Sequence, residues 1–262
     1  MTKLTIASWN VNSIRARLPL IIKWLRNKNP DLLLLQELKA NEENIPREEI
    51  EELNYNFITM GQKAYNGVAI LSKFPVSDIE CNLPNFKNDD QARYIEAWVN
   101  LENKGIRIAS IYAPNGNPIN SEKFTYKLSW LEKFKEHAAK LFELEEFTIL
   151  GGDFNICPTS LDTADETLLY EDAIYKNEVK NIYKNLLNKG YYDAYRTLYP
   201  DKPGFTYWDY GQSFTNDIGV RIDHFLLSPY AMDITNKVYV DKEPRKWIKP
   251  SDHTPICLEI DI

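Results

Sequence analysis

The stretch "RYIEAWVNLENKGIRIASIYAP", residues 93–114, contains two strand-like runs that follow each other with only a few residues between them. Residues 93–101 and 106–114 are both rich in β-branched and aromatic residues and show the alternation of half-buried strands. No helix separates them. Strands that follow each other in this way indicate a mixed or antiparallel sheet, and not a simple doubly wound parallel sheet.

Similar runs recur along the whole chain. Besides these two, we expect strands at residues 4–10, 30–38, 55–61, 67–73, 147–155, 221–228 and 256–262. Helical periodicity is found at residues 17–29, 46–53, 121–142 and 177–190. Pro46 is suited to open the second of these helices, Ser121 to cap the third and Gly190 to close the fourth. The pattern predicts an α/β (α+β) protein whose helices pack outside mixed sheets, and the absence of linkers predicts one domain over residues 1–262.

Composition narrows the class of protein. The chain has 262 residues and a net charge of −7, which argues against a generally sticky nucleic-acid binder but not against a local basic rim. Its apolar runs are too short to span a membrane, and its first residues do not resemble a signal peptide. Three scattered cysteines, Cys81, Cys157 and Cys257, favour buried reduced thiols over disulfides or a zinc site. We therefore expect a cytoplasmic protein that does not bind membranes.

Polar residues gather at the ends of the expected strands. They follow strands at Asn10, Glu37, Tyr112, Asn115, Asp153 and Asn155, and they precede strands at Asp223, Asp252 and His253. In a mixed sheet the start of one strand lies beside the end of its antiparallel neighbour. All these positions can therefore share one rim, where ligands bind in open sheets.

Each position has a structural alternative. Asp153 and Asn155 can form a turn before Pro158, Asp252 can bond the local backbone, and His253 can be a hydrogen-bonded structural histidine. Together, however, these readings require several independent coincidences of residue type and position. Clustered carboxylates repel one another unless a cation lies between them, and oxygen ligands without cysteine favour Mg²⁺ or Mn²⁺.

Other enzyme signatures are absent from the sequence. It has no Walker-type GxxxxGK[ST], no GxGxxG after a strand and no GxSxG nucleophile elbow. The three histidines, His137, His224 and His253, are too scattered for HExxH zinc chemistry.

Eight motifs occur in an order that resembles one family. They are "SWNVNSIRAR" (8–17), "PDLLLLQELK" (30–39), "YNGVAILSK" (65–73), "IYAPNGNP" (111–118), "GGDFNICPT" (151–159), "FTYWDY" (205–210), "GVRIDHFLLS" (219–228) and "KPSDHTPI" (249–256). This set resembles the exonuclease III family of apurinic/apyrimidinic endonucleases, within the endonuclease/exonuclease/phosphatase superfamily. The resemblance covers essentially the whole chain.

The resemblance implies a four-layer sandwich in which two mixed β-sheets pack face to face with helices outside. It also implies a DNA-repair phosphodiesterase of base excision repair that hydrolyses the backbone 5′ to abasic sites. Activity as a 3′-phosphodiesterase and a 3′ to 5′ exonuclease on duplex DNA is expected as well. The expected partners are Mg²⁺ or Mn²⁺ and double-stranded DNA with an abasic site or a 3′-blocked end, bound by a monomer.

The resemblance also assigns roles to residues. Glu37 resembles the principal metal ligand, and the wider metal set implied is Asn10, Glu37, Asp153, Asn155, Asp252 and His253. Asp153 resembles the group that orients or deprotonates the attacking water, and Asn155 the donor that holds the scissile phosphate. His253 resembles the imidazole that contacts the phosphate, with Asp223 paired to it. Tyr112 resembles the phenol on the phosphate side, which completes the expected catalytic set.

Contacts with DNA follow from the same resemblance. The expected residues are Asn12, Arg15, Arg17, Lys39, Asn115, Tyr207, Trp208, Val220 and Ile222, and the last four correspond to the abasic pocket. One of the two aromatic residues, Tyr207 or Trp208, is expected to pack inward. The acidic segment 162–180 follows the family pattern poorly, and we assign it no contact.

Two other functions remain as alternatives at this point. A relative that acts on lipid or inositol phosphates would require a strongly basic or apolar membrane rim. A catalytically silent DNA-binding module would have lost Glu37, Asp153 or His253, all of which are present.

Overall fold

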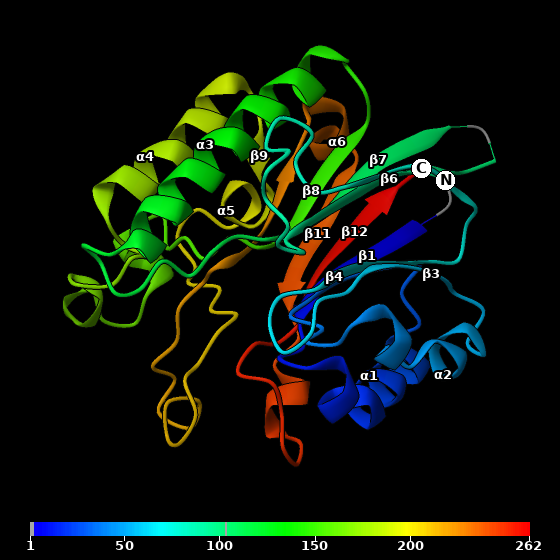
Figure 1. Cartoon of the computed structure of the whole chain (residues 1–262), viewed down its shortest axis with the longest axis horizontal. Coiled ribbons are helices and arrows are strands. Elements are labelled where there is room, and N and C mark those ends of the chain that lie inside the picture. Colours follow the sequence, from blue (N-terminus) through cyan, green and yellow to red (C-terminus); the bar gives the residue numbers. More distant parts are fainter. Residues whose placement is uncertain (1–2, 103) are drawn as a thin grey trace.

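Two six-stranded sheets form the centre of the protein (Figure 1). The computed structural model describes residues 3–102 and 104–262. The first sheet has the order β11-β12-β1-β2-β4-β3, and the second has the order β5-β6-β7-β8-β10-β9. The strands of the first sheet are β1 (Lys3–Asn10), β2 (Leu32–Gln36), β3 (Asn56–Met60), β4 (Val68–Ser72), β11 (Thr235–Val240) and β12 (Ile256–Asp261). Those of the second are β5 (Val76–Cys81), β6 (Tyr94–Asn100), β7 (Gly105–Tyr112), β8 (Thr148–Asp153), β9 (Tyr192–Asp193) and β10 (Asp223–Leu227).

Helices cover the outer faces of both sheets. In Figure 1, α1 and α2 lie on one side of the sheets, and α3 and α4 lie on the opposite side. The helices are α1 (Ile14–Lys28), α2 (Arg47–Glu51), α3 (Glu122–Glu143), α4 (Asn177–Lys189), α5 (Ala194–Leu198) and α6 (Pro229–Asp233). No helix within the described ranges is long and apolar enough to cross a membrane. The predicted four-layer sandwich of two mixed sheets with helices outside is confirmed.

The four consecutive leucines of β2 show why the sheets are covered on both faces. Successive side chains of a strand point to opposite faces. Leu32 and Leu34 accordingly join the core between the two sheets, whereas Leu33 and Leu35 join the core beneath α1. All four are fully buried, so the apolar run "LLLL" is explained by a strand with a hydrophobic layer on each side.

Strand direction brings the polar ends together. β1 and β2 are parallel neighbours and reach the same edge at Asn10 and Gln36. β7 and β8 are parallel as well, with Tyr112 beside Asp153 in register. β10 runs antiparallel to β8, and its first residue, Asp223, pairs with Asp153. The shared rim predicted from the sequence is therefore present, and it is made by both sheets.

The helix ends agree with the sequence except at Ser121. Gly190 ends α4 with a φ of 126°, a conformation that favours glycine, and Pro46 precedes α2. Ser121 occupies the N-cap position of α3, but its hydroxyl donates to the carbonyl of Pro118 at 2.5 Å, without a hydrogen bond to the helix. The prediction of a side-chain cap was therefore wrong.

The sequence did not predict β5, β9 or β11, nor the short helices α5 and α6. β5 is an edge strand whose last four residues are exposed, so it lacks the apolar alternation of a half-buried strand. β9 has two residues, and β11 contains a register shift between Thr235 and Lys237. Cys81 ends β5 and is exposed, which corrects the expectation that all three thiols are buried; Cys157 and Cys257 are buried.

A buried arginine ties three segments together beneath the rim. Arg221 is fully buried; its Nε donates to Asp162 at 2.7 Å, and its two terminal nitrogens donate to Asp193 at 2.9 Å each. Burial alone would raise the pKa values of Asp162 and Asp193, but Arg221 outweighs it and lowers both. Arg221 thereby connects β10 to the short helix at Ser160–Asp162 and to the corner between β9 and α5.

This arrangement makes a prediction about stability. Arg221→Met should lower the free energy of unfolding by about 3–5 kcal/mol, because it removes the arginine that is paired with buried Asp193 and one of the two arginines that are paired with buried Asp162. The measurement is a urea or thermal unfolding curve. Lys246→Met is a matched control, since Lys246 forms an exposed ion pair with Glu243 and should change stability by less than about 1 kcal/mol. Equal stabilities of the two variants would contradict the prediction.

Candidate active site

The centre of the rim is a buried amide that contacts carboxylates from both sheets. Asn10, the last residue of β1, is fully buried. Its Nδ2 donates to Glu37 Oε1 at 2.7 Å and to Asp153 Oδ2 at 3.0 Å, and its Oδ1 accepts from the backbone N–H of Asn12. In this arrangement Asn10 orients the two carboxylates. Its predicted role as a metal ligand stays a prediction.

Backbone conformation helps to aim these groups. Glu37 follows β2 directly and has a φ of 54°, and Asn155, two residues after Asp153, has a φ of 49°. Both values lie in the left-handed region of backbone conformation, which residues other than glycine adopt less often. Hydrogen bonds stabilise this conformation at Asn155. The backbone N–H of Asn155 donates to Asp153 Oδ1 at 2.9 Å, and its side-chain amide donates to the carbonyl of Ala113 at 2.9 Å.

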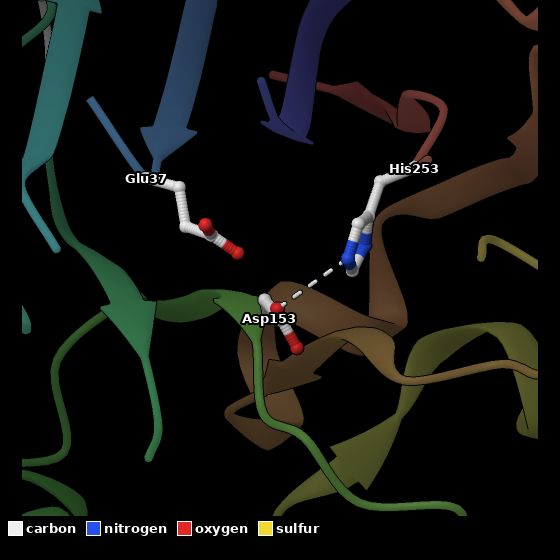
Figure 2. A group of neighbouring side chains, drawn as sticks. All are labelled: Glu37, Asp153 and His253. Atoms are coloured by element: carbon white, nitrogen blue, oxygen red, sulfur yellow. Dashed lines mark ion pairs between the residues drawn. The ribbon is translucent and has the colours of Figure 1, made fainter. Parts of the chain in front are cut away.

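An imidazole lies between two buried carboxylates. His253 Nδ1 is 2.8 Å from Asp223 Oδ2, and His253 Nε2 is 3.7 Å from Asp153 Oδ2, the contact drawn as a dashed line in Figure 2. Burial alone would lower the pKa of His253, but the two carboxylates outweigh it and raise it to about 10. His253 is therefore cationic at neutral pH, with Nε2 facing the site.

For Asp153, burial outweighs the neighbouring cation and raises the pKa of the carboxyl group. Burial raises the pKa of its carboxyl to about 7; the His253 cation opposes this shift, and the Asp223 carboxylate adds to it. A carboxyl group whose pKa lies near neutrality can both lose and accept a proton at physiological pH. The pairing of Asp223 with His253 that was predicted from the sequence is present.

Glu37, Asp153 and His253 converge from three segments (Figure 2). One possible ligand atom from each lies within 4.8 Å of the others. The cluster is dominated by carboxylate oxygens, the donors that hard divalent cations prefer. Glu37 Oε2 also accepts from Lys39 Nζ at 2.7 Å. The residues present therefore fit a divalent cation beside Glu37 and Asp153.

A cavity of about 170 Å³ opens at this cluster. It is lined by Glu37, Tyr112, Asn115, Asp153, Asn155, Asp172, Ile174, Tyr207, Ile222, Asp252 and His253. Asp172 and Ile174 come from the segment 162–180, which sequence reasoning left unassigned. Their signal in the sequence is weak, because they lie in irregular structure with no strand to predict their direction.

Tyr112 closes one side of this cavity. Burial raises the pKa of its phenol well above the ordinary value, and the carboxylates of Glu37 and Asp153 add to the effect, whereas Arg93 opposes it. The guanidinium of Arg93 lies 5.0 Å from the centre of the Tyr112 ring. The phenol therefore keeps its proton at neutral pH and can donate a hydrogen bond to an anionic ligand.

Several expected DNA contacts are engaged within the protein. Asn12 Nδ2 donates to Asp252 Oδ1 at 3.1 Å and to the hydroxyl of Tyr210 at 2.9 Å, and Lys39 Nζ donates to Asn12 Oδ1 at 2.6 Å. Arg17 donates to the carbonyl of Asn12 at 2.8 Å. These side chains connect the loops of the rim. Arg15 and Asn115 are exposed. The contact of these residues with DNA stays a prediction.

The residues of the expected abasic pocket divide into two groups. Tyr207 and Ile222 line the cavity. Trp208 is fully buried, and its ring packs edge-on against Phe214 at 5.2 Å between centroids. Trp208 is therefore the aromatic residue that packs inward, and it does not line the cavity; its predicted place in the abasic pocket stays a prediction. Val220 is buried in the small apolar cluster with Ile222.

Comparison with known proteins agrees with this geometry. The endonuclease/exonuclease/phosphatase family matches residues 7–253, nearly the whole chain. The chain belongs to this family.

Relatives of this family member include repair nucleases. Exodeoxyribonuclease III of Haemophilus influenzae is 32% identical over 263 residues, which cover 96% of this chain and 98% of the relative. The DNA-(apurinic or apyrimidinic site) endonuclease of Dictyostelium discoideum is 29% identical over 99% of this chain and 71% of its own length. The resemblance to the exonuclease III branch is therefore confirmed.

Solved structures in the family are similar over their full length. The 3′ phosphatase NExo from Neisseria, bound to a product DNA hairpin, has a TM-score of 0.94 and 35% identity, with 99% of this chain and 100% of that chain covered. An AP endonuclease from Archaeoglobus fulgidus has the same TM-score and coverage at 32% identity.

The contact between Asp223 and His253 in this family member predicts a pKa change. Asp223→Asn should lower the pKa of His253 from about 10, because a negative charge at 2.8 Å from Nδ1 is removed. The measurement is an NMR titration of the imidazole protons, and His253→Asn identifies the signal among the three histidines. Asp201→Asn, at an exposed position, is the control. An unchanged His253 titration in Asp223→Asn would contradict the pairing.

Proposed function

We propose that this protein is a DNA-repair phosphodiesterase that hydrolyses the backbone of duplex DNA 5′ to abasic sites. The proposal includes 3′-phosphodiesterase and 3′ to 5′ exonuclease activity; proteins named an abasic-site endonuclease, a 3′ phosphatase and a 3′-5′ exonuclease match nearly all of the chain. The observation that carries it is the row of Asp223, His253 and Asp153 beside Glu37, at the mouth of a cavity.

The chemistry follows from the state of each side chain. Asp153, whose carboxyl has a pKa of about 7, orients a water and accepts its proton. His253, held cationic by Asp223, faces the phosphate with Nε2 and stabilises its developing charge. The phenol of Tyr112 donates to a phosphate oxygen, and Asn155 supports the same group. These donors are fixed before substrate binds, so little reorganisation is needed.

We propose Mg²⁺ or Mn²⁺ as the cofactor, held chiefly by Glu37 with Asp153 and Asp252 nearby. When bound, such an ion offsets the negative charge of the carboxylates and of the phosphate. Asp252 Oδ1 accepts from Asn12 Nδ2 at 3.1 Å, so its direction is fixed by the protein. A hard cation with few protein ligands retains positions for phosphate oxygens and water.

The substrate proposed is double-stranded DNA with an abasic site or a blocked 3′ end. Tyr207 and Ile222 offer an apolar wall at the cavity, next to the polar cluster, and a sugar without a base can lie against such a wall. We infer that residues 1–262 act as one endonuclease/exonuclease/phosphatase domain, because both sheets share the central core. A monomeric state and a cytoplasmic location stay predictions.

The first test is cleavage of a duplex that carries one abasic-site analogue, with and without Mg²⁺. We expect incision 5′ to the analogue in the presence of the ion. Glu37→Gln should reduce turnover by at least about 100-fold, since it removes the carboxylate charge that the cation requires. Glu43→Gln is the control, because Glu43 is exposed and outside the cluster. Normal activity of Glu37→Gln in EDTA would contradict the proposal, as would binding of the duplex by wild type without cleavage.

A second test separates chemistry from stability at Asp153. Asp153→Asn should lose about 10²–10⁴-fold in turnover, because the general base is removed. Its melting temperature in EDTA at pH 8 should stay close to that of wild type. Burial of the charged carboxylate, which raises the pKa of Asp153, disfavours folding at this pH, whereas loss of the contact with His253 acts in the opposite direction. Asp201→Asn is the control. A variant that unfolds, with activity that follows the folded fraction, would instead assign Asp153 a structural role.

A further inference from the structure

Lys127 is a lysine on the buried face of α3. The helix buries Lys127, Trp130, Leu131, Phe134, His137, Ala138 and Leu141, which recur at the spacing of one helical face. All except Lys127 and His137 belong to the apolar core between α3 and the second sheet, and His137 is paired with the carboxylate of Glu96. The pattern therefore calls for an apolar residue at position 127. The lysine there is fully buried.

The ammonium group of Lys127 joins two loops at the candidate active site. Nζ donates to the backbone carbonyl of Asn155 at 2.6 Å and to that of Asn115 at 3.0 Å. Asn155 lies in the loop after β8, and Asn115 lies in the loop after β7. Both residues line the cavity beside His253. Lys127 therefore fixes two walls of the cavity from behind, without itself lining it.

The aliphatic part of the Lys127 side chain is closely packed against Gly116. Gly116 has a φ of 87°, and a Cβ added there would lie 2.5 Å from Lys127 Cδ. The next residue, Asn117, forms hydrogen bonds with the segment that contains Asp172 and Ala173. Asn117 Nδ2 donates to Asp172 Oδ1 at 2.9 Å, and the backbone N–H of Ala173 donates to Asn117 Oδ1 at 2.9 Å. The loop after β7 is thereby held between α3 and the segment that supplies Asp172 and Ile174.

Stability alone does not account for a buried lysine at this position, where burial lowers the pKa of the amine to about 7 although Asp153 and Asp172 oppose the shift. Removing a charge from water costs several kcal/mol, and apolar side chains of similar volume are often neutral or stabilising in its place. A lysine provides what an apolar residue lacks, namely donors that reach two carbonyls at once. The carbonyl of Asn155 belongs to a residue in the left-handed conformation, whose orientation needs such support.

We propose that Lys127 is a positioning residue that holds Asn115 and Asn155 in the geometry needed for phosphodiester hydrolysis. This inference rests on the proposed function for its effect on turnover, but its effect on the two loops is independent of substrate. Loss of the ammonium group should leave the loops able to move by a fraction of an ångström or more. A displacement of about 1 Å in a positioned group can reduce turnover by about 100-fold.

The experiment compares Lys127→Met, Lys127→Arg and Leu141→Ala with wild type. Leu141 lies fourteen positions further along α3, about 21 Å away at 1.5 Å per residue, and its truncation weakens the same core without touching the loops. Turnover and KM are measured on the abasic-site duplex and normalised to the folded fraction. Hydrogen exchange is measured separately for residues 113–117 and 154–157.

Lys127→Met should lower kcat by about 10- to 100-fold with KM within about twofold, and exchange in both loops should accelerate. Lys127→Arg, which keeps the donors, should recover most of kcat. Leu141→Ala should lose stability with normal kcat per folded molecule and unchanged loop exchange. If Lys127→Met does not fold, Lys127→Gln, which is polar but too short to reach both carbonyls, replaces it with the same expectation.

Wild-type kcat in a folded Lys127→Met or Lys127→Gln variant, with unchanged exchange in both loops, overturns the inference. Equal losses of kcat in Lys127→Arg and Lys127→Met, with exchange in both loops unchanged in Lys127→Arg, overturn it as well, because turnover would then be lost while the loops are still held. If wild type cleaves no DNA, the proposed function fails, and the exchange data still decide whether Lys127 holds the loops.

Discussion

The side-chain amide of Asn10 donates hydrogen bonds to carboxylates from both sheets, to Glu37 after β2 and to Asp153 at the end of β8. Side chains from the two packed sheets meet throughout the core between them, and at the rim the polar residues at the strand ends meet as well. The distance between Glu37 and Asp153 is thus set by the packing of the two sheets. Because Asn10 is fully buried, water cannot compete for its donors.

Three carboxyl groups, those of Glu37, Asp153 and Asp223, lie in this part of the protein, and their charged surroundings differ. Asp223 is fully buried and contacts His253, which becomes a cation at neutral pH, while Lys39 contacts Glu37. Asp153 is left with a pKa near 7, because burial and Asp223 outweigh His253. Two carboxylates in one rim thereby acquire different roles through their environment. Asp223 stays paired to its imidazole, and Asp153 remains available to accept a proton.

Much of this arrangement could be predicted from the sequence, because it depends on periodicity and on strand ends. The apolar run of β2 and the polar residues after β1, β2 and β8 placed Asn10, Glu37 and Asp153 at one rim. Strands without an apolar pattern could not be found in this way: β5 is largely exposed and β9 has two residues. Trp208 was assigned to the surface by resemblance alone. A motif does not tell which of two adjacent aromatic side chains points inward when neither lies in a regular strand.

The acidic segment 162–180 shows a second limit of sequence reasoning. Its charge argued against a place at a DNA-binding cavity, yet Asp172 and Ile174 line that cavity. Two of its carboxylates, those of Asp162 and Asp172, accept hydrogen bonds within the protein. Asp162 accepts from Arg221 and Arg196, and Asp172 accepts from Asn117 and from the backbone of Ile174. A net charge does not distinguish exposed carboxylates from those that accept hydrogen bonds within the protein. A carboxylate that accepts hydrogen bonds from a buried arginine contributes to the structure beneath the site.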